Sequence, residues 1–263
     1  MSGDTVKVSM QGRVALITLS DPATLNAMTA KTAQALSAAL AAVMAQNARA
    51  VVLTGEGRAF CSGANLQGVG ELHVESDGRP DAGALIEHVF NPLVTAIRDL
   101  AVPLVTAVNG PAAGLGCSLA LLGDLIVAAE SATFLQAFSR VGLVPDAGSS
   151  YLLPRMIGRA RAMEMALLAE PVPARTALEW GLANRCVPDA DLSSTAFELA
   201  ERLARGPAAL GLTRRLLWGS LDAGWIEQLH AERQAQRLAG RTADFDEGVR
   251  AFLDKRPPVF EGR

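Results

Sequence analysis

Two segments of small residues, each following an apolar stretch, constrain this chain more than any other feature. One is Ala-Phe-Cys-Ser-Gly-Ala-Asn-Leu at 59–66, and the other is Asn-Gly-Pro-Ala-Ala-Gly-Leu-Gly-Cys-Ser at 109–118. Each lies where a strand should end and a helix begin, and a helix start leaves backbone N–H groups unpaired and carries a partial positive charge. Two such starts that face one point would form an oxyanion hole of backbone N–H groups. The pair therefore predicts an enzyme that places negative charge on a carbonyl oxygen.

Strand-like apolar runs alternate with helical periodicity over the first 190 residues. The expected strands are residues 6–10, 14–19, 50–53, 104–108, 124–129 and 183–187. The expected helices are residues 30–46, 84–100, 114–122, 148–157, 160–169 and 174–180. Such alternation predicts parallel strands joined by crossover helices. From residue 192 onward almost every residue fits a helix, so we divide the chain into an α/β core, 1–191, and an all-helical region, 192–263.

Composition narrows the class of protein. Half of the 263 residues are hydrophobic and 19% are charged, which permits a large core without disulfides. The net charge of −3 argues against nucleic acid as a partner. The three cysteines form no Cys-x-x-Cys pair, so free thiols in a reducing compartment are expected. The first ten residues lack a signal-peptide pattern, and apolar runs of about ten residues are too short to cross a bilayer, so we expect a cytoplasmic protein without membrane contact.

The remaining candidate motifs are a glycine pair, the histidines and one aspartate. The glycines of Gly114-Leu115-Gly116 resemble the start of a dinucleotide-binding fingerprint, but Leu119 occupies the third glycine position, so no nicotinamide cofactor is expected. None of the histidines lies in a triad signature, and no carboxylate–histidine spacing indicates a metal site. Asp146 follows a proline and precedes a helical run. From spacing alone it is either a helix N-cap or a catalytic residue.

Taken in order, these segments resemble the crotonase (enoyl-CoA hydratase/isomerase) superfamily. The resemblance rests on residues 25–28, 57–66, 107–114 and 251–260, and it covers nearly the whole chain. It implies an α/β fold built as a crotonase-like spiral of ββα repeats, which carries the acyl-CoA site. It also implies a C-terminal all-helical trimerisation region that closes the site, and a homotrimer or dimer of trimers. The implied substrate is an acyl-CoA thioester, with coenzyme A as part of the substrate and no permanently bound cofactor.

The family's pattern also assigns individual residues. Its two oxyanion donors correspond to the backbone N–H groups of Ala64 and Leu115. The resemblance further implies contacts with coenzyme A by Ala27, Arg58, Ser62, Asn65, Leu66, Phe252 and Lys255. Among these, Arg58 and Lys255 are the expected cations for the coenzyme A phosphates, and Lys255 can come from the same or a neighbouring subunit.

Two departures from the family pattern decide the expected chemistry. Hydratases of the family carry one glutamate on the helix after the second donor and another further along the chain, and here these positions hold Ser118 and Phe138. Neither side chain has the proton affinity to activate water, so hydration is disfavoured, and Phe138 is expected to exclude water from the pocket. Asp146 matches the position where some isomerases, and the aromatic dehalogenase branch, hold their working aspartate. Residues 138–148 look closest to the ring-1,2-epoxyphenylacetyl-CoA isomerases.

The expected function is therefore an acyl-CoA isomerase. Asp146 would move a proton between two carbons, shifting a double bond or opening a ring epoxide, while Ala64 and Leu115 stabilise the thioester enolate. The alternatives are an enoyl-CoA hydratase, a hydrolase or dehalogenase with Asp146 as nucleophile, and a non-catalytic acyl-CoA binder. If Asp146 is only a cap, the base would come from the region of Glu71 and Glu75, in a polar stretch (68–83) expected to be a loop.

Overall fold

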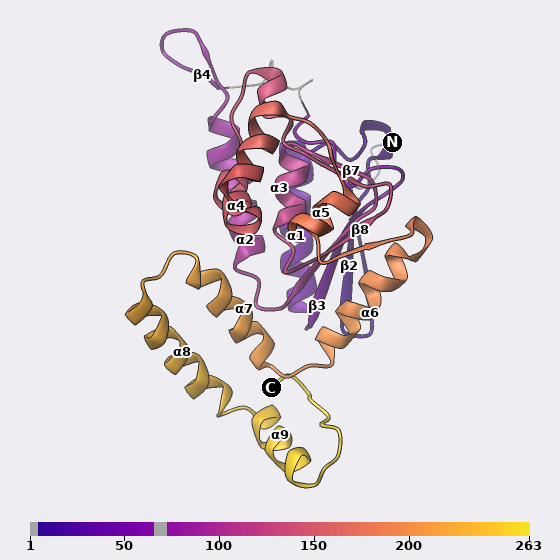
Figure 1. The fold of residues 1–263 in the computed structure, drawn as a ribbon, viewed down its shortest axis with the longest axis vertical. Helices are drawn as coiled ribbons and strands as arrows, with labels where there is room; N and C mark the ends of the chain where they lie inside the picture. Colours follow the sequence, from indigo (N-terminus) through magenta and orange to yellow (C-terminus); the bar gives the residue numbers. More distant parts are fainter. Residues whose placement is uncertain (1–4, 66–72) are drawn as a thin grey trace.

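The main sheet of the computed structural model, which describes residues 5–65 and 73–263, has six strands in the order β1-β2-β3-β6-β8-β11 (Figure 1). Its strands are β1 (Val6–Gln11), β2 (Val14–Leu19), β3 (Ala50–Gly55), β6 (Leu104–Val108), β8 (Leu125–Ala129) and β11 (Arg185–Val187). β1 and β2 form an antiparallel hairpin, and all later neighbours pair in parallel. The predicted parallel pairing with crossover connections is therefore confirmed.

A second, smaller layer is built from strands too short for sequence periodicity to reveal. They are β7 (Pro111–Ala113), β9 (Thr133–Leu135) and β10 (Val172–Pro173). Isolated bridges between Cys61 and Ala112, and between Met28 and Ala64, continue the same pattern. The parallel strands of the main sheet are thus followed by extended segments of the second layer and then by helices. This arrangement is the predicted spiral of ββα repeats.

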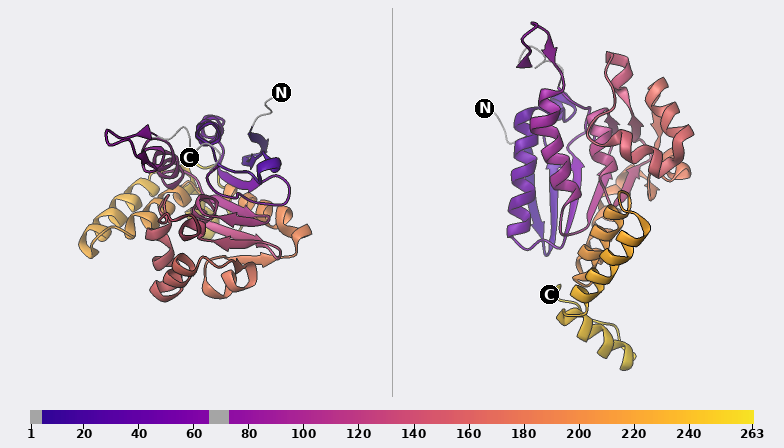
Figure 2. Two further views of the ribbon diagram at one scale, coloured as in Figure 1. Left: turned by 90° about the horizontal axis from the view of Figure 1, so that it is seen from above. Right: turned by 90° about the vertical axis from the view of Figure 1, so that its left-hand side faces the viewer.

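Helices cover both faces of the main sheet (Figure 2). The core helices are α1 (Ala30–Ala45), α2 (Asn91–Arg98), α3 (Leu115–Leu121), α4 (Ser149–Leu168), α5 (Ala174–Trp180) and α6 (Leu192–Ala204). α1 packs against β1, β2 and α2, whereas α6 packs against β2, β3, β6 and β8. The buried residues of α6 recur every four positions and are mostly alanine, so this helix can lie close to the sheet. The predicted function of residues 192–263 in oligomerisation remains a prediction.

Two local features differ from the expected elements, and a third confirms an expected break between two helices. The predicted loop 68–83 contains a short hairpin of β4 (His73–Val74) and β5 (Pro80–Asp81). The predicted helix 84–100 contains a π-helical turn at Ile86–Phe90 and continues as the α-helix α2 from Asn91, beside Pro92. α4 contains a non-helical Gly158 with φ of 78°, which separates the two helices that the sequence predicted there. No helix in the described ranges is long and apolar enough to cross a membrane.

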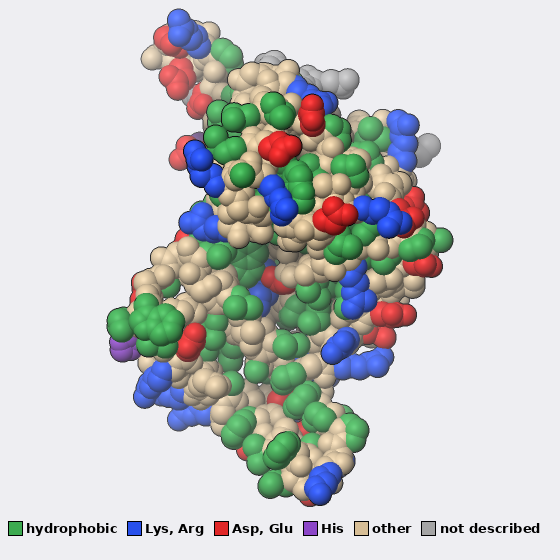
Figure 3. Space-filling model, in the orientation of Figure 1, with side chains coloured by type: hydrophobic (Ala, Val, Ile, Leu, Met, Phe, Trp, Pro, Cys, Tyr) green, Lys and Arg blue, Asp and Glu red, His purple; other side chains and the backbone are tan. Residues whose placement is uncertain are grey.

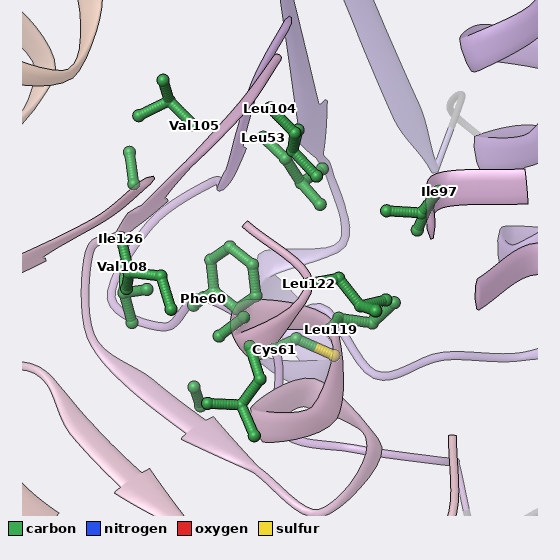
Figure 4. Packing of buried hydrophobic residues seen from close by; sticks show 14 of the residues in the cluster. Leu53, Phe60, Cys61, Ile97, Leu104, Val105, Val108, Leu119, Leu122 and Ile126 are labelled. Carbon is green, nitrogen blue, oxygen red and sulfur yellow. The ribbon is translucent and has the colours of Figure 1, made fainter. Parts of the chain in front are cut away.

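All seven residues of α3 are buried in the core. Figure 4 shows Phe60 and Cys61 beside α3, with Leu119 on the helix, Leu122 directly after it and Val108 at the end of β6. Phe60 and Cys61 are fully buried, so they hold the chain that follows β3 against α3. Fully burying a phenylalanine side chain contributes about 1.5–3 kcal/mol. The core therefore fixes the two small-residue segments against each other.

The last three helices, α7 (Ala209–Ser220), α8 (Trp225–Ala239) and α9 (Ala243–Leu253), form an arm that extends away from the core (Figures 1 and 2). Arg214 of α7 is buried and donates to Asp124 Oδ2 at 2.6 Å and to three carbonyl groups at the C-terminal end of α2. Asp124 also accepts from Trp218 Nε1 at 2.8 Å. Buried Asp244 of α9 accepts from the N–H groups of Ala208, Glu261 and Gly262. These charged side chains attach the arm to the core and the tail to the arm.

Candidate active site

The N-terminus of α3 lies directly after β7, in a turn that only glycine allows. Gly114 has φ of 52° and ψ of −123°, a conformation that residues with a Cβ rarely adopt. A Cβ on Gly116 would lie 2.1 Å from the carbonyl oxygen of Cys61, so the first turn of α3 touches the other small-residue segment. Leu115 opens the helix, and its N–H has no acceptor within it. This N–H can therefore donate to a ligand.

Ala64 lies in a segment that is held against the chain before α1. Met28 N–H donates to Gly63 O at 2.8 Å, and Asn65 N–H donates to Met28 O at 2.9 Å. This pairing directs the N–H of Ala64 away from Met28. A Cβ built on Gly63 would lie 3.7 Å from the backbone nitrogen of Leu115, so the two donor segments lie side by side. The structure thus brings the two predicted donor segments together.

Asp146 lies half-buried between the 3-10 helix Ala137–Val141 and α4. Its Oδ1 is buried and has no hydrogen-bond partner within the described ranges. Burial raises the pKa of this carboxyl from 3.8 to about 6, because desolvation disfavours the charged form. The N-cap of α4 is Gly148, and no side chain caps the helix. Of the two interpretations that spacing left open, the structure therefore excludes the side-chain cap.

The backbone carbonyl of Asp146, in contrast, is well satisfied. It accepts from the N–H of Ser149 at 3.0 Å and from its hydroxyl at 2.9 Å. The hydroxyl of Ser118, which is fully buried in α3, lies 3.2 Å from the same oxygen and 3.3 Å from Gly114 O. Ser118 therefore connects the Asp146 loop to α3. Ser118, which was predicted to occupy a glutamate position of the family, thus contacts the backbone of Asp146 at its carbonyl oxygen.

Phe138 also lies near the N-terminus of α3, and its side chain is 7% exposed. Its ring tip is 3.9 Å from the position that a Cβ on Gly114 would occupy, so the ring lies beside the N-terminus of α3. An apolar ring here removes water from the start of the helix, which strengthens electrostatic interactions nearby. Ser118, Phe138 and Asp146 are thus brought around one helix terminus.

The residues predicted to contact coenzyme A separate into two groups. Ala27, Ser62 and Asn65 lie around the Ala64 segment, where Ser62 Oγ donates to Thr24 O at 2.9 Å. Arg58 is exposed, and its carbonyl lies 2.2 Å from a Cβ built on Gly110, so it borders the second small-residue segment. Leu66 lies outside the described residues.

The other two predicted coenzyme A contacts lie elsewhere. Phe252 is 83% exposed on α9, and Lys255 is exposed just beyond it. Both views of the ribbon place α9 at the end of the molecule opposite the β4–β5 hairpin (Figures 1 and 2). Within one chain, these two residues therefore lie far from the Ala64 segment in space.

Other candidate nucleophiles and bases are poorly placed. Burial raises the pKa of the Cys61 and Cys117 thiols to about 12, which keeps both thiols protonated and unreactive at neutral pH. Glu75 lies exposed in the turn of the β4–β5 hairpin. Glu71 lies outside the described residues. Among the carboxyl groups of residues 5–65 and 73–263, Asp146 is the one that combines partial burial near α3 with a raised pKa.

Two residues with a clear structural role were missed by sequence reasoning. Asn26 and Asn109 lie inside the motifs used above, yet nothing in the sequence indicates what their side chains contact. Both carboxamides bind the backbone of the turn that precedes the Ala64 segment. A periodicity or motif argument cannot find such contacts, because they join residues far apart in the chain.

Comparison with known proteins agrees with this geometry. Residues 9–263 match the sequence profile of the family described as enoyl-CoA hydratase/isomerase. The chain is 44% identical over 266 residues to "Probable enoyl-CoA hydratase" of Rhodobacter capsulatus, covering all of both chains. It is 47% identical over 218 residues to 1,2-epoxyphenylacetyl-CoA isomerase of Escherichia coli, covering 82% of each. A crystal structure of an enoyl-CoA hydratase from Polaromonas sp. superposes with a TM-score of 0.89 at 34% identity, covering 97% of this chain and 99% of that one.

Proposed function

Because the chain belongs to the enoyl-CoA hydratase/isomerase family, which acts on acyl-CoA thioesters, we propose that it is an acyl-CoA isomerase with Asp146 as its base. The observation that carries the proposal is the Asp146 carboxyl, whose Oδ1 is buried without a partner in the described part of the chain and whose pKa is raised to about 6. A base whose pKa lies near the working pH can both accept and return a proton.

In the proposed mechanism, the thioester oxygen accepts hydrogen bonds from the N–H groups of Ala64 and Leu115. Asp146 removes a proton from the carbon next to the thioester carbonyl, and the electron pair moves onto that oxygen as an enolate. Each donor of this kind typically contributes about 3–4 kcal/mol to the transition state. The protonated Asp146 then returns the proton to the carbon at the far end of the double bond. No atom is gained or lost, so the product is an isomer; opening of a ring epoxide would use the same enolate stabilisation.

The side chains around Asp146 favour isomerisation over hydration. Hydration requires one group to activate water and another to handle the proton at the α-carbon. The two family glutamate positions hold Ser118, whose hydroxyl faces backbone carbonyls, and Phe138, which is buried. Neither residue can activate water. The relative named as an epoxyphenylacetyl-CoA isomerase supports the same proposal.

An enoyl-CoA hydratase is the second candidate, because several relatives carry that name, including 2,3-dehydroadipyl-CoA hydratase of Escherichia coli at 36% identity. The experiment that separates the two measures mass-neutral conversion of a 3-enoyl-CoA to the 2-enoyl-CoA against mass-gaining hydration of crotonyl-CoA. We expect isomerisation with very slow hydration. Hydration with kcat/KM of about 10⁴ M⁻¹s⁻¹ or more would contradict the proposal.

The Asp146→Asn variant tests the assigned base. The amide keeps the size of the side chain but cannot accept a proton, so isomerisation and exchange of α-protons in heavy water should both fall steeply. Binding of acyl-CoA should persist, since the proposed oxyanion donors are backbone groups. If Asp146→Asn exchanges and isomerises as fast as the parent, Asp146 is not the base. Mass-spectrometric trapping of an ester at Asp146 would instead favour the hydrolase or dehalogenase mechanism.

The proposal includes an oligomer, either a homotrimer or a dimer of trimers. The arm exposes large apolar side chains, among them Trp225 (76% exposed) and Phe252 (83% exposed). Figure 3 shows hydrophobic side chains, in green, gathered over the lower part of the molecule, where the arm lies in Figure 1. Exposed apolar patches of this kind mark contacts between proteins. In such an assembly, Lys255 of a neighbouring subunit and Arg58 would bind the coenzyme A phosphates. Light scattering that finds a stable monomer at micromolar concentration would contradict the assembly.

A further inference from the structure

The turn between β3 and the Ala64 segment, Gly55–Ala59, is unusually tight. A Cβ on Gly55 would lie 2.3 Å from Ala59 O and 2.4 Å from Phe60 O, so the chain doubles back on itself directly after the strand. The carbonyl groups within such a turn point away from the sheet and need donors from elsewhere. Three of them, at Glu56, Gly57 and Ala59, receive these donors from two asparagine side chains.

Asn109 binds this turn from one side. Its Nδ2 donates to Gly57 O at 2.9 Å and to Ala59 O at 3.2 Å, and its Oδ1 accepts from Gly55 N–H at 3.2 Å. Asn109 directly follows β6 and precedes the chain that becomes β7 and then Leu115. It therefore attaches the segment of the second donor to the turn that leads into the first.

Asn26 binds the same turn from the other side. It is 1% exposed, its Nδ2 donates to Glu56 O at 2.9 Å and to Ala59 O at 2.8 Å, and its Oδ1 accepts from Asp21 N–H at 2.9 Å. Its backbone adopts φ of 59°, a left-handed conformation that asparagine tolerates better than most residues. The same short segment accepts from Ser62 N–H and pairs with Ala64 through Met28.

The two carboxamides thus meet at one atom, the carbonyl oxygen of Ala59. Beyond it, the chain is held on the β7 side, where Phe60 and Cys61 N–H both donate to Pro111 O. It is held on the Asn26 side by the bridge between Met28 and Ala64. Each asparagine therefore lies where a series of backbone hydrogen bonds begins. Both series hold the segment that carries Ala64 in place.

We propose that Asn26 and Asn109 are positioning residues that set the mutual placement of the Ala64 and Leu115 N–H groups. The inference rests on the proposed function, because it assigns those N–H groups to the thioester oxygen. Two donors stabilise one oxygen only if both point at it, and a misplacement of about 1 Å can reduce a rate about 100-fold. Loss of either carboxamide would relax the turn and separate the donors, although neither asparagine touches the reacting atoms.

The test measures polarisation of a bound thioester carbonyl in Asn109→Ala. Asn109 is only half-buried, so water can replace its donors and the variant can fold. Isotope-edited infrared spectra of a saturated acyl-CoA, labelled at the carbonyl carbon, report the carbonyl frequency in the bound state. We expect the parent to shift this band to lower frequency and the variant to lose at least half of the shift. The kcat for isomerisation should fall by about 10- to 100-fold with KM changing less than about threefold.

Asn184→Ala is the matched control. In the parent, Asn184 Oδ1 accepts from Ile126 N–H at 2.7 Å near the β11 edge of the same sheet, away from both donor segments. This variant should keep the carbonyl shift and the kcat of the parent. A purely structural role for Asn109 would lower the folded fraction, measured by circular dichroism, but not the carbonyl shift or the kcat per folded subunit. If Asn109→Ala does not fold, Asn109→Asp keeps the shape and the acceptor for Gly55 N–H, and it replaces the donor by a carboxylate oxygen that cannot bind Gly57 O or Ala59 O.

The outcomes separate this inference from the proposed function. A folded Asn109 variant with the full carbonyl shift and a kcat within twofold of the parent would overturn the inference. A parent that shifts the carbonyl but does not isomerise would contradict the proposed reaction and leave the positioning role standing. A parent that shows no carbonyl shift would contradict the oxyanion role of Ala64 and Leu115, and the positioning role with it.

Discussion

Replacing the Asp146 carboxylate by an amide should stabilise the fold while it removes activity. Burial raises the pKa of Asp146 from 3.8 to about 6, so the folded state holds its proton more tightly than the unfolded chain does. A raised aspartate pKa means that the charged form destabilises the fold. This penalty is absent below the unfolded pKa, grows between about pH 4 and pH 6, and is complete above the folded pKa. Asp146→Asn removes the charge and hence the penalty.

The size of the effect follows from the shift. Two pKa units correspond to about 3 kcal/mol, and because Asp146 is only half-buried, solvent screening reduces the expected gain to about 1–2 kcal/mol. The lost charge cannot cost a helix cap, since no side chain caps α4. The expected result is therefore a higher free energy of unfolding for Asp146→Asn at pH 8 and almost no difference at pH 4.

The assay is urea unfolding of the parent and Asp146→Asn at pH 8, 6 and 4, at one protein concentration because an oligomer's stability depends on it. Asp246→Asn is the matched control, because it removes the same charge from an exposed site on α9. The reasoning is refuted if Asp146→Asn is equally or less stable than the parent at pH 8. A gain of the same size at all three pH values would also refute it.

The remaining predictions concern the pH profile, the docking of the arm and the first turn of α3. The kcat/KM for isomerisation should fall with decreasing pH along an acid limb near pH 6, where Asp146 becomes protonated; a profile flat down to pH 4.5 would exclude it as the base. Arg214→Ala should destabilise the protein by about 3–5 kcal/mol in urea unfolding, because it leaves Asp124 without its buried partner, whereas exposed Arg215→Ala should cost less than about 0.5 kcal/mol. Gly116→Ala should lose most activity, since its Cβ would lie 2.1 Å from Cys61 O; Gly219→Ala, whose Cβ would meet nothing within 4 Å, should retain it.

The sequence determined the elements and the class of fold. The strands and helices of the core were predictable because long apolar runs and helical periodicity are local signals, and the prediction located β6 and α3 closely. The two small-residue segments also indicated where the chain would place unpaired N–H groups. Short strands such as β7 and β9 escaped prediction, because three residues are too few for any period to show.

The tertiary structure decided what the side chains of the site contact. Spacing left Asp146 open between a cap and a catalytic residue. Only the fold shows that Gly148 is the N-cap of α4 and that Oδ1 of Asp146 is buried without a partner in the described part of the chain. From the sequence, Ser118 is only a serine at a position where the family pattern has a glutamate. The structure shows that its hydroxyl lies within hydrogen-bond distance of the Asp146 carbonyl oxygen. Asn26 and Asn109, which both donate to Ala59 O, lie 33 and 50 positions from it in the chain. Such contacts depend on how distant segments pack, which local patterns in a sequence do not encode.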